Sequence, residues 1–485
     1  MTTTNLLRAP ARTAPATPAP RGAETPGLAP SASRPASFED RPGDALLRAL
    51  VVAALLGMVA LSTWVAALAL GAGASWASAA PGGATLGATL GGLLAGPVRV
   101  ALAVWGVLAA LGLAVQTLLW LRYRPFAPAT PEEAPTLTVV IPAYNEGPMV
   151  ARSIESVARA RYPRGRLEVF VVDDGSRDDT WAHIERAAAR FPDLVTTLRF
   201  PENRGKRAAL EAGFLRARGE VLVTIDSDSV IDEGTLLAIA GPFRDPKVGA
   251  VAGKVAVHNR EDGVIPKMLH VAFSLSFDFR RAAQSEYGTV YCCPGALTAY
   301  RASVVRDALP GWVDQHFLGA RCAAGEDRAL TNEVLARRHD TVYQRAAVVR
   351  TLVPTTHRQL CKMFLRWDRS YVREEARFAR IVWRRPPAKL ALALFDGLVR
   401  NLSLPVRYAA LGLVVAACAL EPLLLPAVAL ATAGGALVRM LWYVRQERSL
   451  DFVYGVLYAF YFVLGLSWIF PYAVVTVRAR GWLTR

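Results

Sequence analysis

Long apolar stretches alternate with a charged central region along this chain. Two stretches, at residues 46–70 and 98–121, are each long enough to cross a bilayer as a helix. Further stretches follow at about 408–420 with its lead-in, at 422–444 and at 452–475. This pattern predicts five or six membrane segments. A buried helical hairpin in a soluble protein is the alternative for the first two, and their length and lack of charge disfavour it.

Basic residues flank the first two stretches. Arg41 and Arg48 precede the first, and Arg122 and Arg124 follow the second. Because cytoplasmic flanks of membrane helices collect lysine and arginine, we expect a multi-pass protein of the cell membrane whose central domain is cytoplasmic. Arginines also follow the last stretch, so we expect Pro471 to divide it into a span and a re-entrant or interfacial piece. The side on which the chain ends stays open.

Between residues 136 and 349, short apolar runs alternate with amphipathic helices, a pattern typical of an open α/β sheet covered by helices. Strands are predicted at 137–141, 167–172, 195–200 and 221–225. Ligands bind such sheets beyond the carboxyl ends of the strands. Polar clusters follow three of these ends, so the sequence predicts one site there.

Two polar clusters suit a nucleotide. Asp173 and Asp174 follow the second strand, where carboxylates can accept hydrogen bonds from an imide and from ribose hydroxyls. The alternative is an N-cap of the next helix. The segment 203–207 places Gly205 and Lys206 at a helix entrance, which suits contact with phosphate oxygens. A solvated charge run is the alternative there.

Two acidic pairs carry the candidate chemistry. Asp226 and Asp228 end the fourth strand, so both carboxylates can approach a divalent cation that bridges a diphosphate, unless they only form a turn. Later in the chain, Glu326 and Asp327 stand together in the segment 325–328. A carboxylate in a partly buried cleft can take the proton of an attacking hydroxyl, which makes Asp327 the candidate base. The alternative is an acidic helix start, which the helix dipole favours.

Aromatic and basic residues alternate at helical spacing over 362–385, which predicts a basic amphipathic helix suited to an anionic membrane surface. The alternative is that the helix packs against the soluble domain. One face can do so while another lies on the membrane surface. We therefore expect five regions: a disordered cytosolic tail at 1–43, a transmembrane hairpin at 44–124, the α/β domain at 125–350, interfacial amphipathic helices at 351–400 and a transmembrane region at 401–485.

Composition agrees with this division. A hydrophobic content of 53% over 485 residues is unusual for a soluble domain alone and ordinary for such a domain joined to several spans. Much of the excess behind the net charge of +16 lies beside apolar runs, and no groove-reading module is present, so we expect no nucleic-acid partner. The five cysteines show neither zinc-type spacing nor an even disulfide framework, which indicates reduced thiols.

Six motifs follow one another along the chain: IPAYNE at 141–146, DDGS at 173–176, DSD at 226–228, YCCPG at 291–295, GEDRALTN at 325–332 and RWDRSYVRE at 366–374. In this order they resemble those of processive family 2 glycosyltransferases, above all hyaluronan synthases and rhizobial chitin-oligosaccharide synthases. The resemblance covers about residues 122–485, and the ending 481–485 is similar to the short Trp-containing tail of hyaluronan synthases.

The resemblance implies a GT-A-type nucleotide-sugar-binding fold between transmembrane helices, a UDP-sugar donor, a growing polysaccharide as acceptor, and Mg²⁺ or Mn²⁺ on Asp226 and Asp228. It further implies that Asp327 is the base beside Glu326 and that Trp367 stacks on the acceptor or gates the site. The acceptor-binding residues are then Cys293, Gly295 and Trp367. The donor-binding residues are Tyr144, Glu146, Asp173, Asp174, Lys206, Asp226 and Arg366.

One position departs from the family. Met363 stands where the family has a glutamine, three residues before the Arg366-Trp367 pair. A thioether cannot replace the donors and acceptor of an amide, so a nucleotide or loop contact is absent here or is made by Gln359 or Lys362. The departure bears on processivity or donor affinity more than on the type of reaction.

The predicted reaction inverts the anomeric carbon, releases UDP and delivers the polymer through the adjoining spans. The donor is UDP-N-acetylglucosamine alone or in alternation with UDP-glucuronate, with UDP-glucose not excluded. The alternatives are a non-processive enzyme acting on a polyprenyl phosphate and a non-enzymatic scaffold. A dinucleotide oxidoreductase is disfavoured because no Gly-x-Gly-x-x-Gly follows the first strand. Oligomeric state stays open.

Overall fold

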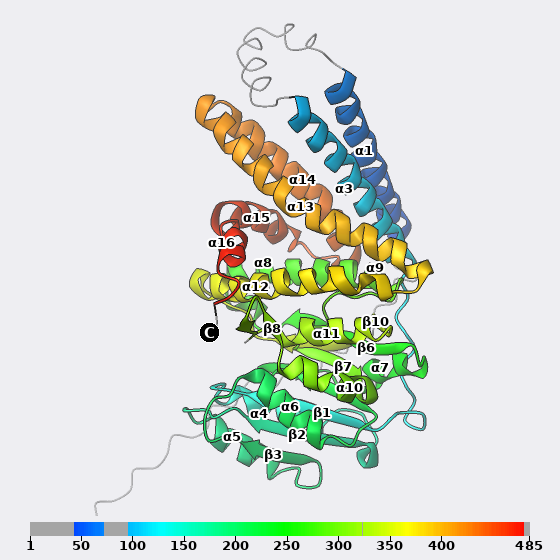
Figure 1. Ribbon diagram of the computed structural model, residues 1–485, viewed down its shortest axis with the longest axis vertical. Coiled ribbons are helices and arrows are strands. Elements are labelled where there is room, and N and C mark those ends of the chain that lie inside the picture. Colours follow the sequence, from blue (N-terminus) through cyan, green and yellow to red (C-terminus); the bar gives the residue numbers. More distant parts are fainter. Residues whose placement is uncertain (1–42, 72–95, 323, 480–485) are drawn as a thin grey trace, which may run out of the picture. The chain divides into compact units, whose positions relative to one another are not determined.

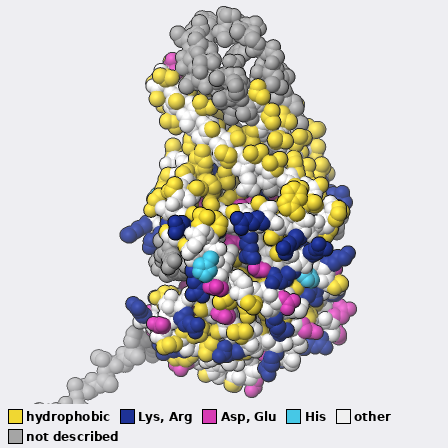
Figure 2. All heavy atoms as spheres, in the orientation of Figure 1, with side chains coloured by type: hydrophobic (Ala, Val, Ile, Leu, Met, Phe, Trp, Pro, Cys, Tyr) yellow, Lys and Arg dark blue, Asp and Glu magenta, His cyan; other side chains and the backbone are white. Residues whose placement is uncertain are grey.

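The computed structural model describes residues 43–71, 96–322 and 324–479. The predicted tail therefore lies almost wholly outside the described residues, as do the connection between the first two predicted spans and the ending at 480–485. The described chain comprises an α/β part, where most charged side chains gather, and a helical part whose visible surface is largely hydrophobic (Figure 1 and Figure 2).

An eight-stranded mixed sheet forms the centre of the α/β part, in the order β3-β2-β1-β4-β7-β6-β10-β5. Strands β1 to β4 are parallel, and β7 is antiparallel to its neighbours β4 and β6. Strands β1 and β4 are buried at every position, because continuous apolar strands are covered on both faces. The strands are β1 Leu137–Ala143, β2 Leu167–Asp173, β3 Val195–Arg199, β4 Val221–Ile225, β5 Ser229–Ile231, β6 Val248–Val257, β7 Leu297–Arg301 and β10 Asp340–Thr351.

The predicted α/β sheet and its four parallel strands are thus confirmed. A separate two-stranded hairpin consists of β8 (His316–Phe317) and β9 (Ala320–Arg321). Amphipathic helices such as α4 bury their apolar residues against the sheet. The helices of this part are α4 Met149–Ala158, α5 Thr180–Ala188, α6 Lys206–Arg216, α7 Thr235–Ala240, α8 Val264–Ser274, α9 Ala282–Ser285, α10 Ala302–Val313 and α11 Glu326–Ala336, with short turns η1 Arg164–Arg166, η2 Gly241–Arg244 and η3 Arg260–Asp262 and a π-helical turn η4 Leu275–Arg281.

Among the described residues, three helices are long and apolar enough to cross a membrane, or four if a bent pair near the carboxyl end is one span. The first predicted stretch falls in α1 (Asp44–Gly71), which packs against α3 (Gly96–Arg122). Most side chains in the second half of α1 lie outside the described set. The candidate spans are Ala103–Arg122, α13 Pro387–Leu420, α14 Leu424–Glu447 and the pair Phe452–Leu466 with Ile469–Val475.

The predicted break near Pro471 is present. Helix α15 (Phe452–Tyr461) continues into a π-helical turn, η6 (Phe462–Leu466), and then bends by 43° into α16 (Ile469–Val475). Proline lacks the N–H that would bond the carbonyl four residues earlier, which belongs to Ser467. The Tyr408 hydroxyl of α13 donates to that carbonyl instead, at 2.8 Å.

The predicted amphipathic helix is α12 (His357–Ile381), which is followed by η5 (Val382–Arg384). It begins earlier than expected, because the Thr356 hydroxyl caps its first turn. One face packs against α11 and α16, where Arg369 and Arg373 are buried. The packing alternative therefore holds for this face. The next helix, α13, runs without interruption across the predicted regional boundary at residue 400.

Candidate active site

The loops after β1 and β2 are tied together at the carboxyl edge of the sheet. The Asn145 N–H donates to Ser176 Oγ at 3.0 Å, and the N–H groups of Glu146 and Gly147 both donate to Thr180 Oγ1 at 2.8 Å. Tyr144 and Glu146 are half-buried at this edge. The structure therefore brings two of the three predicted clusters into contact.

Asp173 and Asp174 have different surroundings. Asp173 is fully buried, accepts the Ser176 N–H at 3.2 Å and lies 3.3 Å from Arg199 Nε. Asp174 accepts the N–H groups of Arg204 at 2.7 Å and Gly205 at 2.9 Å, with the Asn203 amide at 3.0 Å. Burial raises the pKa of Asp174, and these donors oppose the increase. The Asp174 carboxylate thus anchors the basic loop that precedes α6.

The first residue of α6 joins the two acidic pairs. Lys206 Nζ lies 2.5 Å from Asp226 Oδ1 and 3.1 Å from Glu326 Oε1. Burial alone would lower the pKa of Lys206, but the charges of Asp226, Glu326 and Asp327 outweigh it and raise the pKa. Burial likewise disfavours ionised Glu326, yet the Lys206 ammonium holds its pKa below the ordinary value. The cluster therefore contains an ionised lysine–glutamate pair.

Gly295 separates the lysine from the candidate base. A Cβ atom at this position would lie 2.8 Å from Lys206 Nζ and 3.5 Å from Asp226 Oδ1, closer to the ammonium than ordinary packing permits. Its backbone N–H donates to Asp327 Oδ2 at 3.3 Å. With glycine at this position, the YCCPG loop lies beside the lysine and the base without displacing the Lys206 ammonium.

Asp327 is held from two sides. Its Oδ1 accepts the Arg328 N–H at 2.7 Å, and its Oδ2 faces Gly295 and, at 3.9 Å, the Cys292 sulfur. Burial and the neighbouring Glu326 charge raise the pKa of Asp327. The pKa values of adjacent carboxyl groups are thus pushed apart, as they are where one group must exchange a proton. The side chain is only partly buried, which leaves it accessible to an acceptor.

Helix α11 begins at this motif because Gly325 adopts a left-handed conformation, with φ of 83°. A Cβ atom there would lie 2.0 Å from Ser370 Oγ of α12. Any side chain at position 325 would therefore push α12 away from the start of α11. This contact places the RWDRSYVRE segment beside the acidic motif, and the Arg366 charge acts on Glu326.

The second aspartate of the DSD segment is buried and oriented. Asp228 Oδ1 accepts hydrogen bonds from Ser229 Oγ at 3.1 Å and Thr351 Oγ1 at 3.0 Å. Within the described part of the chain, no three His, Cys, Asp or Glu residues converge as a metal cage. Mg²⁺ and similar ions commonly take one or two carboxylates and complete their shell with water and substrate phosphates, so the carboxylates of Asp226 and Asp228 are of the kind that could hold such an ion.

The predicted acceptor residues differ in accessibility. Trp367 is 42% exposed, with ring centroids of Phe364 and Phe273 at 5.6 and 6.2 Å. Cys293 is completely buried, and its N–H donates to Thr331 Oγ1 at 3.1 Å. Its side chain therefore lies in the core, whereas the preceding cysteine approaches the base.

Sequence reasoning missed Arg281, which supports the cysteine loop. Its Nε donates to the Cys292 carbonyl at 3.0 Å from the π-helical turn η4. No local signal predicts this turn, because the wider i to i+5 spacing leaves no distinct hydrophobic period over seven residues. Met363, at the position of the family's glutamine, packs against an apolar cluster that contains Leu360 and Ile469.

Comparisons with known proteins support these observations. Residues 138–309 match the model of the family described as Glycosyl transferase family 2. An N-acetylglucosaminyltransferase of Azorhizobium caulinodans is 30% identical over 351 residues, which cover 72% of this chain and 87% of that protein. A hyaluronan synthase of Streptococcus pyogenes is 33% identical over 276 residues, which cover 56% of this chain and 65% of that protein.

Coverage varies among such relatives, since the chain spans only 59% of a Rhizobium meliloti N-acetylglucosaminyltransferase. Among solved structures, a mannosyltransferase of Pyrobaculum calidifontis, determined with GDP-Man and Mn²⁺, has a TM-score of 0.52 and 24% identity. This likeness covers 75% of the chain and 99% of the mannosyltransferase, and it shows a shared fold.

Proposed function

Since the chain belongs to glycosyl transferase family 2, has a GT-A-like domain and carries helices long and apolar enough to cross a membrane, we propose that it is a membrane glycosyltransferase that polymerises a UDP-sugar processively and exports the product. The proposed donor is UDP-N-acetylglucosamine, alone or in alternation with UDP-glucuronate. The observation that carries the proposal is the convergence of Asp226, Lys206, Gly295 and Asp327 at one edge of the sheet.

Asp327 is the proposed base. Its raised pKa suits removal of a proton from the acceptor's terminal hydroxyl as that oxygen attacks the anomeric carbon. The Gly295 N–H at 3.3 Å orients the carboxylate, and the neighbouring cysteine loop would lie against the terminal sugar. Attack from the face opposite the nucleotide inverts the anomeric configuration.

Donor binding is assigned to the opposite side of the cluster. Lys206 can move from Asp226 toward a phosphate oxygen, and Arg366 adds a second positive charge near Glu326. The loop anchored by Asp174 fixes the position of the N-terminus of α6, whose helix dipole favours an anionic diphosphate. Tyr144, Glu146 and Asp173 belong to the adjoining loops and complete the proposed nucleotide site.

Asp226 and Asp228 would hold Mg²⁺ or Mn²⁺. When bound, such an ion neutralises charge on the departing diphosphate. The hydroxyls of Ser229 and Thr351 fix the orientation of the Asp228 carboxylate. Asp226 is then the carboxylate that would exchange Lys206 for the metal ion. Trp367 is exposed and directly follows Arg366, whose charge acts on Glu326. Its ring is the proposed stacking surface for the acceptor.

The membrane helices would provide a route by which the polymer leaves the site. Helix α12 packs between α11, which begins at Glu326, and α16, so the proposed chemistry lies next to the helical part of the chain. From the arginines that flank the first two spans, we assign the α/β domain to the cytoplasm. The apolar stretches give five or six membrane segments in all. Transfer and export by one chain would then follow each other without release of the polymer.

Purified protein in lipid, given each labelled UDP-sugar singly and in pairs with Mg²⁺ or Mn²⁺, tests this proposal. We expect long polymer from wild type and none from Asp327→Asn. A requirement for two donors identifies an alternating polymer, and incorporation from UDP-N-acetylglucosamine alone identifies a chitin-type product. Label found only in extractable lipid would overturn processive synthesis, and retention of all polymer inside sealed, right-oriented vesicles would overturn export.

A further inference from the structure

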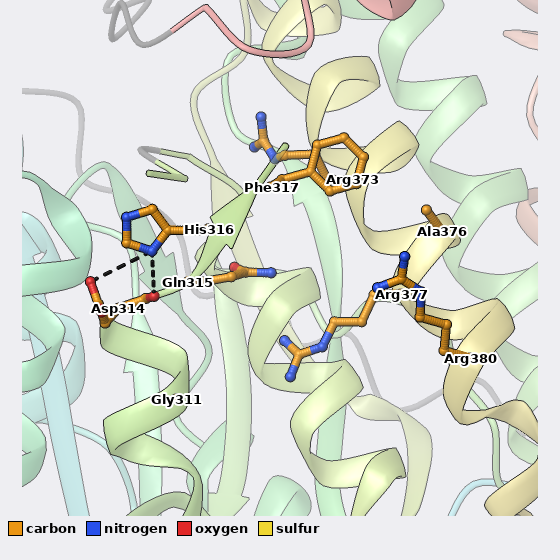
Figure 3. Close-up of a pocket in the computed structure, with 9 residues that line it drawn as sticks. All are labelled: Gly311, Asp314, Gln315, His316, Phe317, Arg373, Ala376, Arg377 and Arg380. Atoms are coloured by element: carbon orange, nitrogen blue, oxygen red, sulfur yellow. Dashed lines mark hydrogen bonds and ion pairs between the residues drawn. The ribbon is translucent and has the colours of Figure 1, made fainter. Parts of the chain in front are cut away.

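A pocket of about 280 Å³ lies between α12 and the segment that follows α10 (Figure 3), and none of its lining residues belongs to the acidic cluster. Three arginines project into it from α12, toward the segment that carries Gln315 and His316. The size is near the lower end of small-ligand pockets. The residues that line it are Gly311, Asp314, Gln315, His316, Phe317, Arg373, Ala376, Arg377 and Arg380.

The lining carries an excess of positive charge. Arg373, Arg377 and Arg380 are spaced by four and three residues, so they occupy one face of the helix. The single acidic residue of the lining is Asp314, whose side chain is 74% exposed and lies 3.7 Å from His316 Nδ1. Three guanidinium groups therefore face one carboxylate at the rim.

Two of the three arginines have an N–H group that makes no hydrogen bond within the described residues. Arg373 is 6% exposed and donates to the carbonyls of Ala324 at 2.6 Å and Val477 at 3.4 Å, while its buried Nε has no hydrogen-bond partner among the described residues. Arg377 pairs with Glu333, which also binds Arg337, and its buried Nη1 likewise has no partner in the described chain. A buried donor without an acceptor is costly, and a rotation of either guanidinium group toward the pocket would let an oxygen-rich anion accept from it.

We propose that this pocket binds a phosphate group, supplied either by a soluble small molecule or by a lipid headgroup. Guanidinium forks match the oxygens of phosphate and bind them with paired hydrogen bonds. A lipid source is open because α12 also packs against α16 of the bent pair, and Trp383, just after α12, is 66% exposed. This inference goes beyond glycosyl transfer and does not depend on it.

Hydrogen bonds connect the pocket wall to α12 and to the start of α11, where Glu326 and Asp327 lie. Gln315 Nε2 donates to Glu374 Oε1 at 2.6 Å, and Arg207 donates to Gln315 Oε1 at 3.1 Å. Trp312, next to the lining residue Gly311, donates through Nε1 to the Glu326 carbonyl at 2.9 Å. A bound phosphate would neutralise the repulsion among the arginines and brace α12 against this wall.

Thermal unfolding of the full chain in nanodiscs tests the site, without donor sugar and without divalent metal. In one arm, phosphatidylcholine discs receive inorganic pyrophosphate; in the other, phosphatidylglycerol replaces part of the phosphatidylcholine. Arg380→Gln removes an exposed pocket arginine, and Arg358→Gln removes an exposed arginine of the same helix outside the pocket. Lys206→Met removes the cation that the proposed donor site offers to phosphate, so it reports any pyrophosphate bound there.

We expect a saturable rise of about 3 °C or more in at least one arm for wild type, Arg358→Gln and Lys206→Met, each measured against the same protein without the anion. Arg380→Gln should need at least a fivefold higher concentration of the anion for the same rise. A response to pyrophosphate identifies a soluble ligand, and a response to phosphatidylglycerol alone identifies a lipid. No rise in either arm, equal responses of the two arginine variants, or loss of the rise in Lys206→Met would each overturn the site, whatever the outcome of the polymer assay.

Discussion

The ammonium nitrogen of Lys206 lies 2.5 Å from a carboxylate oxygen of Asp226, and this contact joins the start of α6 to the end of β4. Glu326, from α11, shares the same ammonium at 3.1 Å. The lysine thus neutralises charge from both acidic segments before any donor arrives. A donor diphosphate with its metal ion would replace one of these ion pairs and leave the net charge of the cluster nearly unchanged.

Replacing this lysine is expected to damage both binding and stability. Lys206→Met leaves Asp226 and Glu326 without their shared cation, and breaking a largely buried ion pair costs on the order of 3 kcal/mol. We expect a lower unfolding temperature and UDP affinity reduced at least tenfold, measured by calorimetry. Lys247→Met, in an exposed turn, is the control and should match wild type. Unchanged UDP affinity in Lys206→Met would rule out a donor role for the lysine.

Removal of the candidate base should affect the chemical step alone. Asp327→Asn keeps the size of the side chain, and general-base catalysis typically contributes about 10² to 10⁴ in rate. We expect kcat for UDP release to fall by at least a factor of about 100, with UDP affinity within about twofold of wild type. Asp307→Asn, on the exposed surface of α10, should retain full activity. Near-normal turnover in Asp327→Asn would assign the base elsewhere.

The raised pKa of Asp327 predicts the acidic limb of the pH–rate profile. The base works only when ionised, so activity should fall as pH decreases through this pKa, at a pH above the ordinary aspartate value of about 4. Glu326→Gln removes a neighbouring negative charge that favours the protonated form, so the limb should move to lower pH. A limb that moves to higher pH, or stays in place, in Glu326→Gln would contradict the coupling between the two carboxyl groups.

The glycine between the lysine and the base gives a steric test. Gly295→Ala would place Cβ 2.8 Å from Lys206 Nζ, the mobile end of a flexible side chain, so the fold should tolerate the change. The ammonium would have to leave its position beside Asp226, and we expect kcat/KM to fall about tenfold, which equals about 1.4 kcal/mol of transition-state stabilisation. Gly165→Ala, with no atom within 4 Å of its Cβ, is the control. Similar unfolding temperatures would show that the loss is local.

The sequence predicts the parallel half of the sheet well, because each strand is a short apolar run followed by a polar cluster. It does not predict β7, which enters antiparallel between β4 and β6 and pairs residues about 75 positions apart. The three strand ends are likewise visible in the sequence, whereas Lys206 between Asp226 and Glu326 is not. That contact depends on how closely the starts of α6 and α11 approach, which Gly295 permits and no local pattern encodes.

The bend before α16 offers a test of the membrane part. Pro471 leaves the Ser467 carbonyl without its helical partner, and the Tyr408 hydroxyl supplies the hydrogen bond at 2.8 Å. Tyr408→Phe removes only that hydroxyl, so the carbonyl loses its donor and the protein should lose about 1 kcal/mol of stability. A lower unfolding temperature in detergent would show this, with Tyr458→Phe as control because its hydroxyl bonds no residue in the described chain. Equal unfolding temperatures for the two variants would mean that the bend is held by packing, without help from the tyrosine.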